Sequence, residues 1–303
     1  MQDGTVWTEG EGSYGQLGDG TQGTGRFASS PVQVSGLAHI TQIAGGVFSA
    51  YGLRSDGTVW AWGAEDVGAL GTGVNTASGT SPTPVQVPGL TGVTAIAADT
   101  GTTVYAVKGD GTVWVWGCGA QGGHGDGTTD EVGDLVPTLV PGLSAISQVQ
   151  TTLMGTVFAF NRSGEAWAWG NDAENLTGTG IPGAVSGGTT VTTSPQQITG
   201  VSNAVAGGGD MILRSDGRVY VWNATHGPEL AVTPTNGTAL DGATFSLIRL
   251  RLSRSRPAHQ SNRAVACATA VFPPGSLTVE AIWISMASPS WIRCLSFRSE
   301  APL

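Results

Sequence analysis

The chain is poor in charge: 12% of its 303 residues are charged, and Lys108 is its one lysine. The formal net charge of −9 argues against nucleic acid and against an anionic membrane surface as partners of the whole chain. No apolar run reaches the roughly 20 residues of a membrane helix. The cysteines, Cys118, Cys267 and Cys294, are odd in number and lack metal-ligand spacing, so neither a disulfide framework nor a cysteine metal site is indicated.

Glycine, proline and tryptophan are abundant instead, with 48, 15 and 10 residues. So much glycine and proline argues against a helical protein, and no Gly-X-Y period indicates collagen. The 40% of hydrophobic residues argues against a disordered chain. These proportions predict an all-β protein with many turns.

A pentapeptide recurs along the chain. Asp3-Gly4-Thr5-Val6-Trp7 returns at Asp56 and Asp110, and in looser form at Ser163 and Asp216, in steps of 53 or 54 residues. So regular a period indicates a repeat architecture, in which each unit buries apolar surface against its neighbours.

Each unit divides into four short strands, predicted in the second unit at Ile40–Ala44, Phe48–Leu53, Val59–Trp62 and Pro84–Val87. The Asp-Gly pair between the second and third strands predicts a two-residue hairpin with positive φ at both positions. The third strand is apolar on both faces, which is typical of a sheet covered on both sides, as in a propeller blade. Proline at the start of the fourth strand indicates an outer edge.

The motif Asp-Gly-x-Val-Trp-x-Trp-Gly at Asp56–Gly63, with a Gly-Gln-Leu-Gly-x-Gly turn like that at Gly15–Gly20, resembles the regulator of chromosome condensation repeat family. The resemblance covers residues 1–232 and implies a seven-bladed β-propeller. Three complete and two partial units are present, so a partial, bacterial-type member is expected. The predicted fold is an all-β propeller of about 53-residue, four-stranded repeats, with 4–5 blades in an open or incomplete ring.

The chain divides at residue 244. Residues 1–244 hold the repeats, anchored at positions 3, 56, 110, 163 and 216, whereas residues 245–303 are rich in Arg and Ser and contain one glycine, Gly275. This tail is interpreted as a non-native reading frame, a basic appendage or a degenerate closing blade. Because the sequence begins inside a repeat and carries no signal peptide, we expect a fragment of a longer protein. An extracellular or cell-surface location is favoured if a signal peptide lies upstream.

No catalytic, cofactor-binding or metal-binding residues are predicted. The repeated aspartates are interpreted as turn residues, and the tryptophans as packing between blades. His124 occupies a position held by Leu17 and Leu70 in other units, so it is interpreted as a packing substitution or a surface residue. The predicted structural residues of the repeat are Asp56, Gly57, Trp60, Trp62, Gly63, Asp110, Gly111, Trp114, Trp116, Trp167, Trp169, Asp216, Gly217 and Trp222.

These features favour a non-enzymatic scaffold that binds a protein partner through variable Gly/Ser/Thr loops. The acidic surface favours a partner with a basic patch. The resemblance implies two alternatives: a guanine nucleotide exchange factor for a small GTPase, or an inhibitor of a secreted enzyme. No cofactor, nucleic acid or membrane is expected as a partner.

Overall fold

The structure is a computed structural model, which describes residues 4–74, 79–100, 102–129, 133–152, 155–172, 191–208, 211–223, 226–230, 264–266 and 284–286. Two compact units divide the chain, Met1–Leu230 and Ala231–Leu303. In the second unit the described residues form one antiparallel pair, β19 (Ala264–Ala266) with β20 (Ile284–Met286). Most of 231–303 lies outside the described residues, so the boundary at 244 and the interpretation of the tail stay predictions.

The described part of the first unit consists of β-strands and two 3-10 turns, η1 (Asp66–Gly68) and η2 (Ala120–Gly122), with no α-helix in that part. The strands are β1 (Trp7–Glu11), β2 (Phe27–Gln33), β3 (Ile40–Gly45), β4 (Ser49–Arg54), β5 (Val59–Ala64), β6 (Thr80–Gln86), β7 (Val93–Ala98), β8 (Thr103–Lys108), β9 (Val113–Gly117), β10 (Asp134–Leu139), β11 (Ile146–Thr151), β12 (Thr156–Asn161), β13 (Ala166–Asn171), β14 (Val191–Gln197), β15 (Ala204–Gly208), β16 (Met211–Arg214), β17 (Val219–Asn223) and β18 (His226–Leu230).

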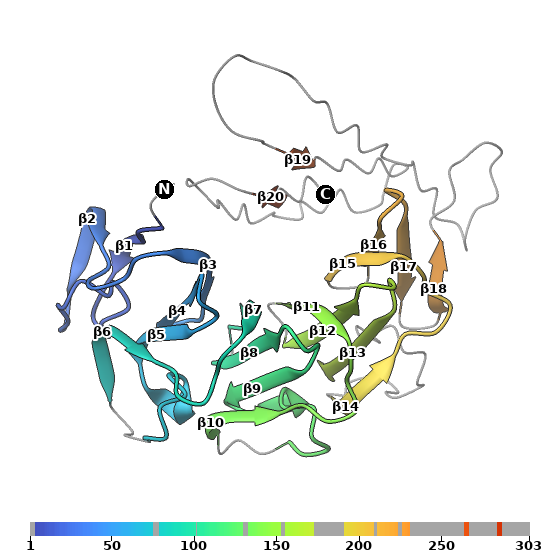
Figure 1. The fold of residues 1–303 in the computed structure, drawn as a ribbon, viewed down its shortest axis with the longest axis horizontal. Coiled ribbons are helices and arrows are strands. Elements are labelled where there is room, and N and C mark those ends of the chain that lie inside the picture. The colour runs from blue at the N-terminus through green and yellow to red at the C-terminus, as the bar shows by residue number, and fades with distance from the viewer. Residues whose placement is uncertain are drawn as a thin grey trace, which may run out of the picture. The chain divides into compact units, whose positions relative to one another are not determined.

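The strands pair in chain order into antiparallel sheets, as Figure 1 shows. Four sheets have four strands each, β3–β6, β7–β10, β11–β14 and β15–β18, and β1 pairs with β2 alone. This confirms the predicted fold class of four-stranded propeller repeats, and the described sheets do not close a ring. The count of three complete units was too low, because β18 pairs with β17 and completes a fourth sheet.

The Asp-Gly hairpins differ from the predicted two-residue turn. In the β4–β5 hairpin, Gly57 has φ +80°, whereas Asp56 is not among the residues with positive φ. The Gly57 N–H donates to the Arg54 carbonyl at 2.9 Å, and the Arg54 N–H donates to the Thr58 carbonyl at 2.9 Å. The loop therefore has three residues, and only its glycine adopts the left-handed conformation.

The four strands predicted to begin at a proline, β2, β6, β10 and β14, start earlier than predicted. β6 begins at Thr80, and Pro84 lies inside it, between two stretches of pairing that are separated by a register shift. Proline has no N–H to donate, and a bulge on an edge strand leaves no ladder bond unmet. The proline therefore marks a bulge and not the start of the strand. The same arrangement occurs at Pro31 in β2, Pro137 in β10 and Pro195 in β14.

The hydrophobic core lies between successive sheets. One cluster joins Tyr51, Leu53 and Val59 of the β3–β6 sheet to Ile96 and Trp116 of the β7–β10 sheet. Equivalent clusters lie at the next two junctions. Burial stabilises by about 25 cal/mol per Å² of apolar surface, so each sheet depends on its neighbours for much of its stability.

The first strands of neighbouring sheets are also linked by hydrogen bonds. The side-chain amide of Gln42 on β3 donates to the Ile96 carbonyl of β7 at 2.7 Å and accepts from the Ile96 N–H at 3.0 Å. Gln150 on β11 similarly accepts from the Gly207 N–H of β15 at 2.7 Å. These hydrogen bonds from glutamine side chains to the backbone of the next sheet fix the register between sheets as well as the distance between them.

Each sheet has two ends, which are named here for their connections. The hairpin face carries the Asp-Gly hairpins between second and third strands. The loop face carries the connections from first to second strand and from third to fourth strand, including the Gly-rich loops with η1 and η2.

Candidate functional site

In β5, β9 and β13 the second tryptophan of the strand binds the Gly-rich loop of the preceding sheet. Trp116 of β9 donates its indole N–H to the Ala69 carbonyl at 3.1 Å, across the junction between two sheets. Trp62 and Trp169 make the equivalent bonds, to the carbonyls of Gln16 at 3.0 Å and Gly123 at 2.9 Å. The three indoles are at most 1% exposed. They pack between successive sheets.

Two of these loop carbonyls accept a second buried donor. The Tyr51 hydroxyl donates to the Ala69 carbonyl at 3.0 Å, and the Tyr105 hydroxyl donates to the Gly123 carbonyl at 2.8 Å. A carbonyl oxygen has two lone pairs, so it satisfies both donors. Burial raises the pKa of both tyrosines above the ordinary range, which keeps the hydroxyls protonated. Each loop is thereby fixed both by its own sheet and by the next one.

The first tryptophan of each third strand lies toward the hairpin face. Trp60 donates its indole N–H to the Thr58 hydroxyl at 3.2 Å, and that hydroxyl donates to the Asp56 carboxylate at 2.6 Å. The bond from Thr58 lowers the pKa of Asp56, because it favours the ionised form. Trp114, Thr112 and Asp110 repeat this chain of bonds. The aspartate thus orders the hairpin and, through the threonine, one indole.

The predicted structural residues therefore separate into two groups at opposite ends of the strands. Toward the hairpin face lie Asp56, Gly57, Trp60, Asp110, Gly111, Trp114, Trp167, Asp216 and Gly217. Toward the loop face lie Trp62, Gly63, Trp116 and Trp169. Trp222 belongs to β17, and its side chain lies outside the described residues. The two groups do not come together as one site.

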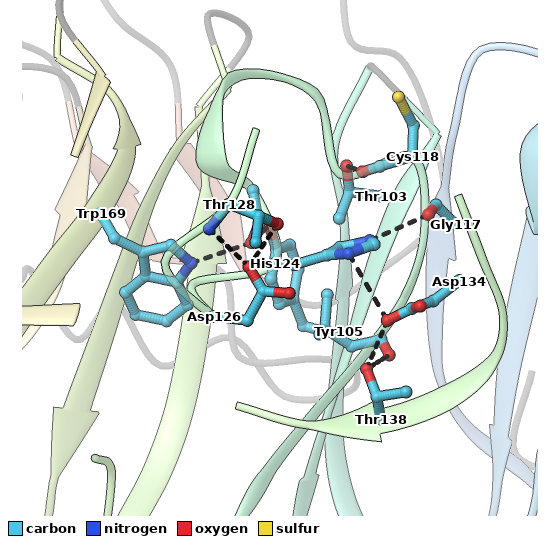
Figure 2. A network of polar contacts seen from close by, with 12 residues as sticks. Thr103, Tyr105, Gly117, Cys118, His124, Asp126, Thr128, Asp134, Thr138 and Trp169 are labelled. Carbon is cyan, nitrogen blue, oxygen red and sulfur yellow. Dashed lines mark hydrogen bonds and ion pairs between the residues drawn. The ribbon is translucent and has the colours of Figure 1, made fainter. Parts of the chain in front are cut away.

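His124 belongs to a buried polar network on the loop face, shown in Figure 2. Its side chain is 3% exposed, so the surface alternative was wrong. Nε2 lies 2.9 Å from the Gly117 carbonyl, and Nδ1 lies 3.5 Å from Asp134 Oδ2. The Thr138 hydroxyl donates to the same carboxylate at 2.6 Å. Periodicity placed His124 among the leucines of the repeat, but it did not predict the acidic partner from β10.

This network can order a loop but is poorly arranged for catalysis. A carbonyl oxygen only accepts, so His124 Nε2 carries a proton and donates it to Gly117. Nδ1 faces Asp134, which leaves neither ring nitrogen directed at a substrate. A general base needs a nitrogen within reach of the proton that it removes. The His–Asp pair is therefore a structural contact that joins the Gly-rich loop to β10.

We expect His124→Ala to lower the free energy of unfolding by about 2–4 kcal/mol, and His124→Leu by only about 1 kcal/mol. Alanine leaves a cavity, whereas leucine fills the volume that Leu17 and Leu70 fill in other units. Both variants remove the donor to Gly117, so the difference between them measures packing. Urea unfolding of the two proteins tests this, and equal losses would show that the polar contacts dominate instead.

Glu65 is a buried carboxyl at the start of the neighbouring Gly-rich loop. It is 5% exposed, and Oε1 has no hydrogen-bond partner within the described part of the protein. Burial raises the pKa of Glu65 to about 7, although the Leu70 N–H and the Thr72 hydroxyl oppose that rise. The carboxyl therefore changes its charge near neutral pH, on the face that carries the variable loops.

Because the folded-state pKa of Glu65 lies above its ordinary value of 4.5, stability falls as pH rises from about 4.5 through 7 and stays lower above that. We expect Glu65→Gln to remove this loss. At pH 8 the variant should be more stable than the unsubstituted protein by about 1–3 kcal/mol, and the difference should vanish near pH 5. Denaturant unfolding between pH 5 and 8.5 measures it. Curves that stay parallel across this range would contradict the expectation.

The described residues offer no metal centre: among them, no group of three or more His, Cys, Asp and Glu side chains is arranged to hold a metal ion. In the same residues no helix has the length and apolarity to cross a membrane.

The repeat geometry coincides with a known family. A family model for the regulator of chromosome condensation (RCC1) repeat matches residues 3–51, 56–105 and 110–158, and a second model of that repeat matches 40–69. The chain belongs to the regulator of chromosome condensation repeat family. The matched RCC1 repeats begin at Asp3, Asp56 and Asp110, which are the first three anchors of the sequence period.

Curated relatives share these RCC1 repeats over part of their length. The human E3 ubiquitin-protein ligase HERC2 is 35% identical over 131 residues, which are 43% of this chain and 3% of HERC2. The mitochondrial RCC1 domain-containing protein RUG3 of Arabidopsis thaliana is 34% identical over 181 residues, 58% of this chain and 38% of RUG3. The chain thus spans well under half the length of either relative.

Solved RCC1-type structures have the same fold. The crystal structure of human WBSCR16 matches with a TM-score of 0.59 at 18% identity, covering 77% of this chain and 64% of that protein. Yeast RCC1 (Prp20), solved with Kap60, matches with a TM-score of 0.60 at 21% identity, covering 77% of this chain and 59% of that chain. These matches establish the propeller fold of the repeats.

Proposed function

We propose that this RCC1-repeat chain is a non-enzymatic scaffold that binds a protein partner through its loop face. The observation that carries the proposal is the locking of the Gly-rich loops by buried indoles, as at Trp116 and Ala69. Rigid supports reduce the conformational entropy lost on binding, so variable segments built on them are suited to recognition.

The polar groups of this face also favour a binding role over a catalytic one. The titratable network around His124 is occupied by backbone and carboxylate contacts, and the Tyr51 and Tyr105 hydroxyls both donate to loop carbonyls. Each group therefore stabilises the loops that would contact a partner.

The variable segment between Asp19 and Phe27 gives a direct test. Gln22 and Thr24 lie in this exposed segment. The Gln22 side chain accepts a hydrogen bond from the Thr80 hydroxyl, and Arg26 is held by Asp19 at 2.6 Å. The full chain with Gln22→Ala and Thr24→Ala should lose a captured protein that the unsubstituted chain binds saturably. The matched control is Asp56→Asn with Asp110→Asn on the hairpin face, which should retain that protein.

Capture on immobilised chain, followed by binding measurements with the purified partner, provides the readout. If the loop-face variant retains the captured protein and the hairpin-face variant loses it, the partner binds on the hairpin face. A chain that binds no protein saturably would contradict the proposed function. Accelerated nucleotide release from a small GTPase would instead assign the exchange role implied by the family resemblance.

A further inference from the structure

Two exposed aromatic side chains meet on the loop face at the junction of the first two sheets. Tyr14, in the loop after β1, is 44% exposed, and Phe48, just before β4, is 38% exposed. Their ring centroids are 4.7 Å apart, at an interplanar angle of 46°. Val47 beside them is 47% exposed. Exposed aromatic groups of this kind are characteristic of protein-binding surfaces, where Tyr and other aromatic residues supply much of the binding energy.

The repeat provides an internal comparison for this pair. At the next two junctions the equivalent positions hold Val67 with Thr102, and Gln121 with Gly155. The spatial equivalence is direct at the third junction, where a Cβ on Gly155 would lie 3.3 Å from the Gln121 side chain. At those junctions neither of these two positions holds an aromatic residue, so the architecture does not require Tyr14 and Phe48.

The backbone below the pair is fixed. The Phe48 carbonyl accepts the Ala64 N–H at 2.8 Å, and the Tyr14 N–H donates to the Gln16 side chain at 2.9 Å. A third bond, from the Gly46 N–H to the Ser49 carbonyl at 2.9 Å, closes the loop before β4. The two rings are therefore presented on ordered loops, which lowers the entropy lost when a partner binds.

The charge balance differs between the two faces, and the acidic face indicates the partner's chemistry. The hairpin face is mixed, because Arg54, Lys108, Arg162, Arg214 and Arg218 lie on or beside the hairpins together with Asp56, Asp110, Glu165 and Asp216. The acidic residues described at the exposed or half-exposed surface of the loop face are Glu11, Asp19, Asp66, Asp126 and Asp134, whereas Glu65, Asp99 and Asp172 are buried. Arg26 is the basic residue described on that face, and its guanidinium is paired with Asp19 at 2.6 Å.

Two carboxylates that are close to the aromatic pair in sequence or through one backbone bond come from the two sheets. Glu11 lies three residues before Tyr14 and accepts the Ser13 N–H at 3.1 Å. Asp66 opens η1, two residues after the Ala64 that is bonded to Phe48. The bonds from Ser13 also lower the pKa of Glu11, so this carboxylate stays ionised at neutral pH. Such an acidic surface repels phosphate and attracts cationic side chains.

We propose that Tyr14, Val47 and Phe48 form a docking site for a basic polypeptide segment, whose arginine or lysine side chains lie over the rings and pair with Glu11 and Asp66. A guanidinium over Tyr or Phe gains a cation–π attraction in addition to its ion pairs. This site deepens the proposed function and rests on it, because it specifies one surface and one partner chemistry.

The test uses the full chain and a fluorescein-labelled 12-residue peptide of alternating Arg and Leu, with a Glu/Leu peptide as the control probe. Fluorescence anisotropy should show salt-dependent binding of the Arg peptide alone. Tyr14→Ala with Phe48→Ala should weaken that binding at least tenfold. Trp7→Ala is the matched control, because Trp7 is also 44% exposed but lies at the hairpin end of β1. The affinity of this variant for the Arg peptide should change less than twofold.

A second pair of variants tests the charges. Glu11→Gln with Asp66→Asn should weaken binding at least fivefold and flatten its salt dependence, whereas Asp56→Asn with Asp110→Asn removes the same charge from the hairpin face with less than twofold effect. Thermal unfolding of each variant confirms that it is folded. Absence of Arg-peptide binding, equal binding of the Glu peptide, or equal losses in the matched controls would each overturn the docking site.

The proposed function can survive that failure. If the Tyr14→Ala, Phe48→Ala protein still captures a partner that the Gln22/Thr24 variant loses, the loop face binds proteins but this aromatic site is not where they dock. If no protein is captured by any form of the chain, the broader proposal fails first.

Discussion

Trp116→Ala is expected to lower the free energy of unfolding by about 3–5 kcal/mol, the range for removing a large aromatic side chain from a core. The indole is fully buried between two sheets and packs edge-on against Tyr51, with ring centroids 6.3 Å apart. Its removal opens a cavity at the junction and loses the bond to the Ala69 carbonyl. Urea or thermal unfolding of the full chain measures the loss.

Trp116→Phe separates the contribution of ring packing from that of the hydrogen bond between Trp116 and the Ala69 carbonyl. The Ala69 carbonyl keeps the Tyr51 hydroxyl as a donor at 3.0 Å, so it is not left unsatisfied. We therefore expect phenylalanine to lower the stability by about 1–2 kcal/mol, well below the effect of alanine. A loss as large as that of Trp116→Ala would show that the indole N–H, and not the ring volume, holds the loop.

Gly63→Ala is expected to lower the free energy of unfolding by about 2–5 kcal/mol, although it adds a single methyl group. Gly63 has φ +106°, and a Cβ there would lie 2.3 Å from the Phe48 carbonyl oxygen. The contact involves backbone that is hydrogen-bonded to Ala64, so the chain cannot move away without breaking the β4–β5 pairing.

Gly10 is the matched control for this substitution. It holds the equivalent position in β1 with φ +108°, but a Cβ added there would meet no atom within 4 Å. Gly10→Ala is therefore expected to lower the free energy of unfolding by only about 1–2 kcal/mol, the cost of placing alanine at a positive φ. The difference in stability between the two variants measures the cost of the contact between the methyl group added at position 63 and the Phe48 carbonyl. If thermal unfolding shows equal losses, the positive φ alone explains the loss of stability.

The consequences of Gly63→Ala extend to the proposed docking site. Phe48 is presented by the same backbone that Gly63 allows to approach. A shift of that carbonyl would move one ring of the aromatic pair. The packing that stabilises the second sheet therefore also positions a proposed binding residue.

The relation between the repeats and the loops explains why the sequence says more about fold than about partner. The indole-to-carbonyl bonds recur at three described junctions, through Trp62, Trp116 and Trp169, because each of these junctions packs in the same way. The loops between them differ from unit to unit, since the architecture constrains only their ends. Partner recognition is therefore expected at residues that depart from the repeat, and Tyr14 and Phe48 are two of them.

The sequence by itself determined the period, the strand order and the burial of the third strand on both faces. These follow from local signals, since the Asp-Gly pair and the alternating Val-Trp pattern act within a few residues of Asp56 and Asp110. The role of the aspartates in the turns could be predicted for the same reason. An aspartate accepts a hydrogen bond from the backbone N–H two residues ahead, as Asp56 does from Thr58.

Only the tertiary structure decided which residues meet across junctions. The bonds from Trp116 to Ala69 and from Gln42 to Ile96 join residues 47 and 54 apart in sequence, and the register of two sheets sets both. The register between sheets also brings Tyr14 to Phe48. Within one sheet, the pairing of β10 with β9 brings Asp134 to the buried His124. A repeat pattern specifies what each sheet contains, but the contacts between sheets depend on packing, where one exchanged side chain changes the chemistry of a junction.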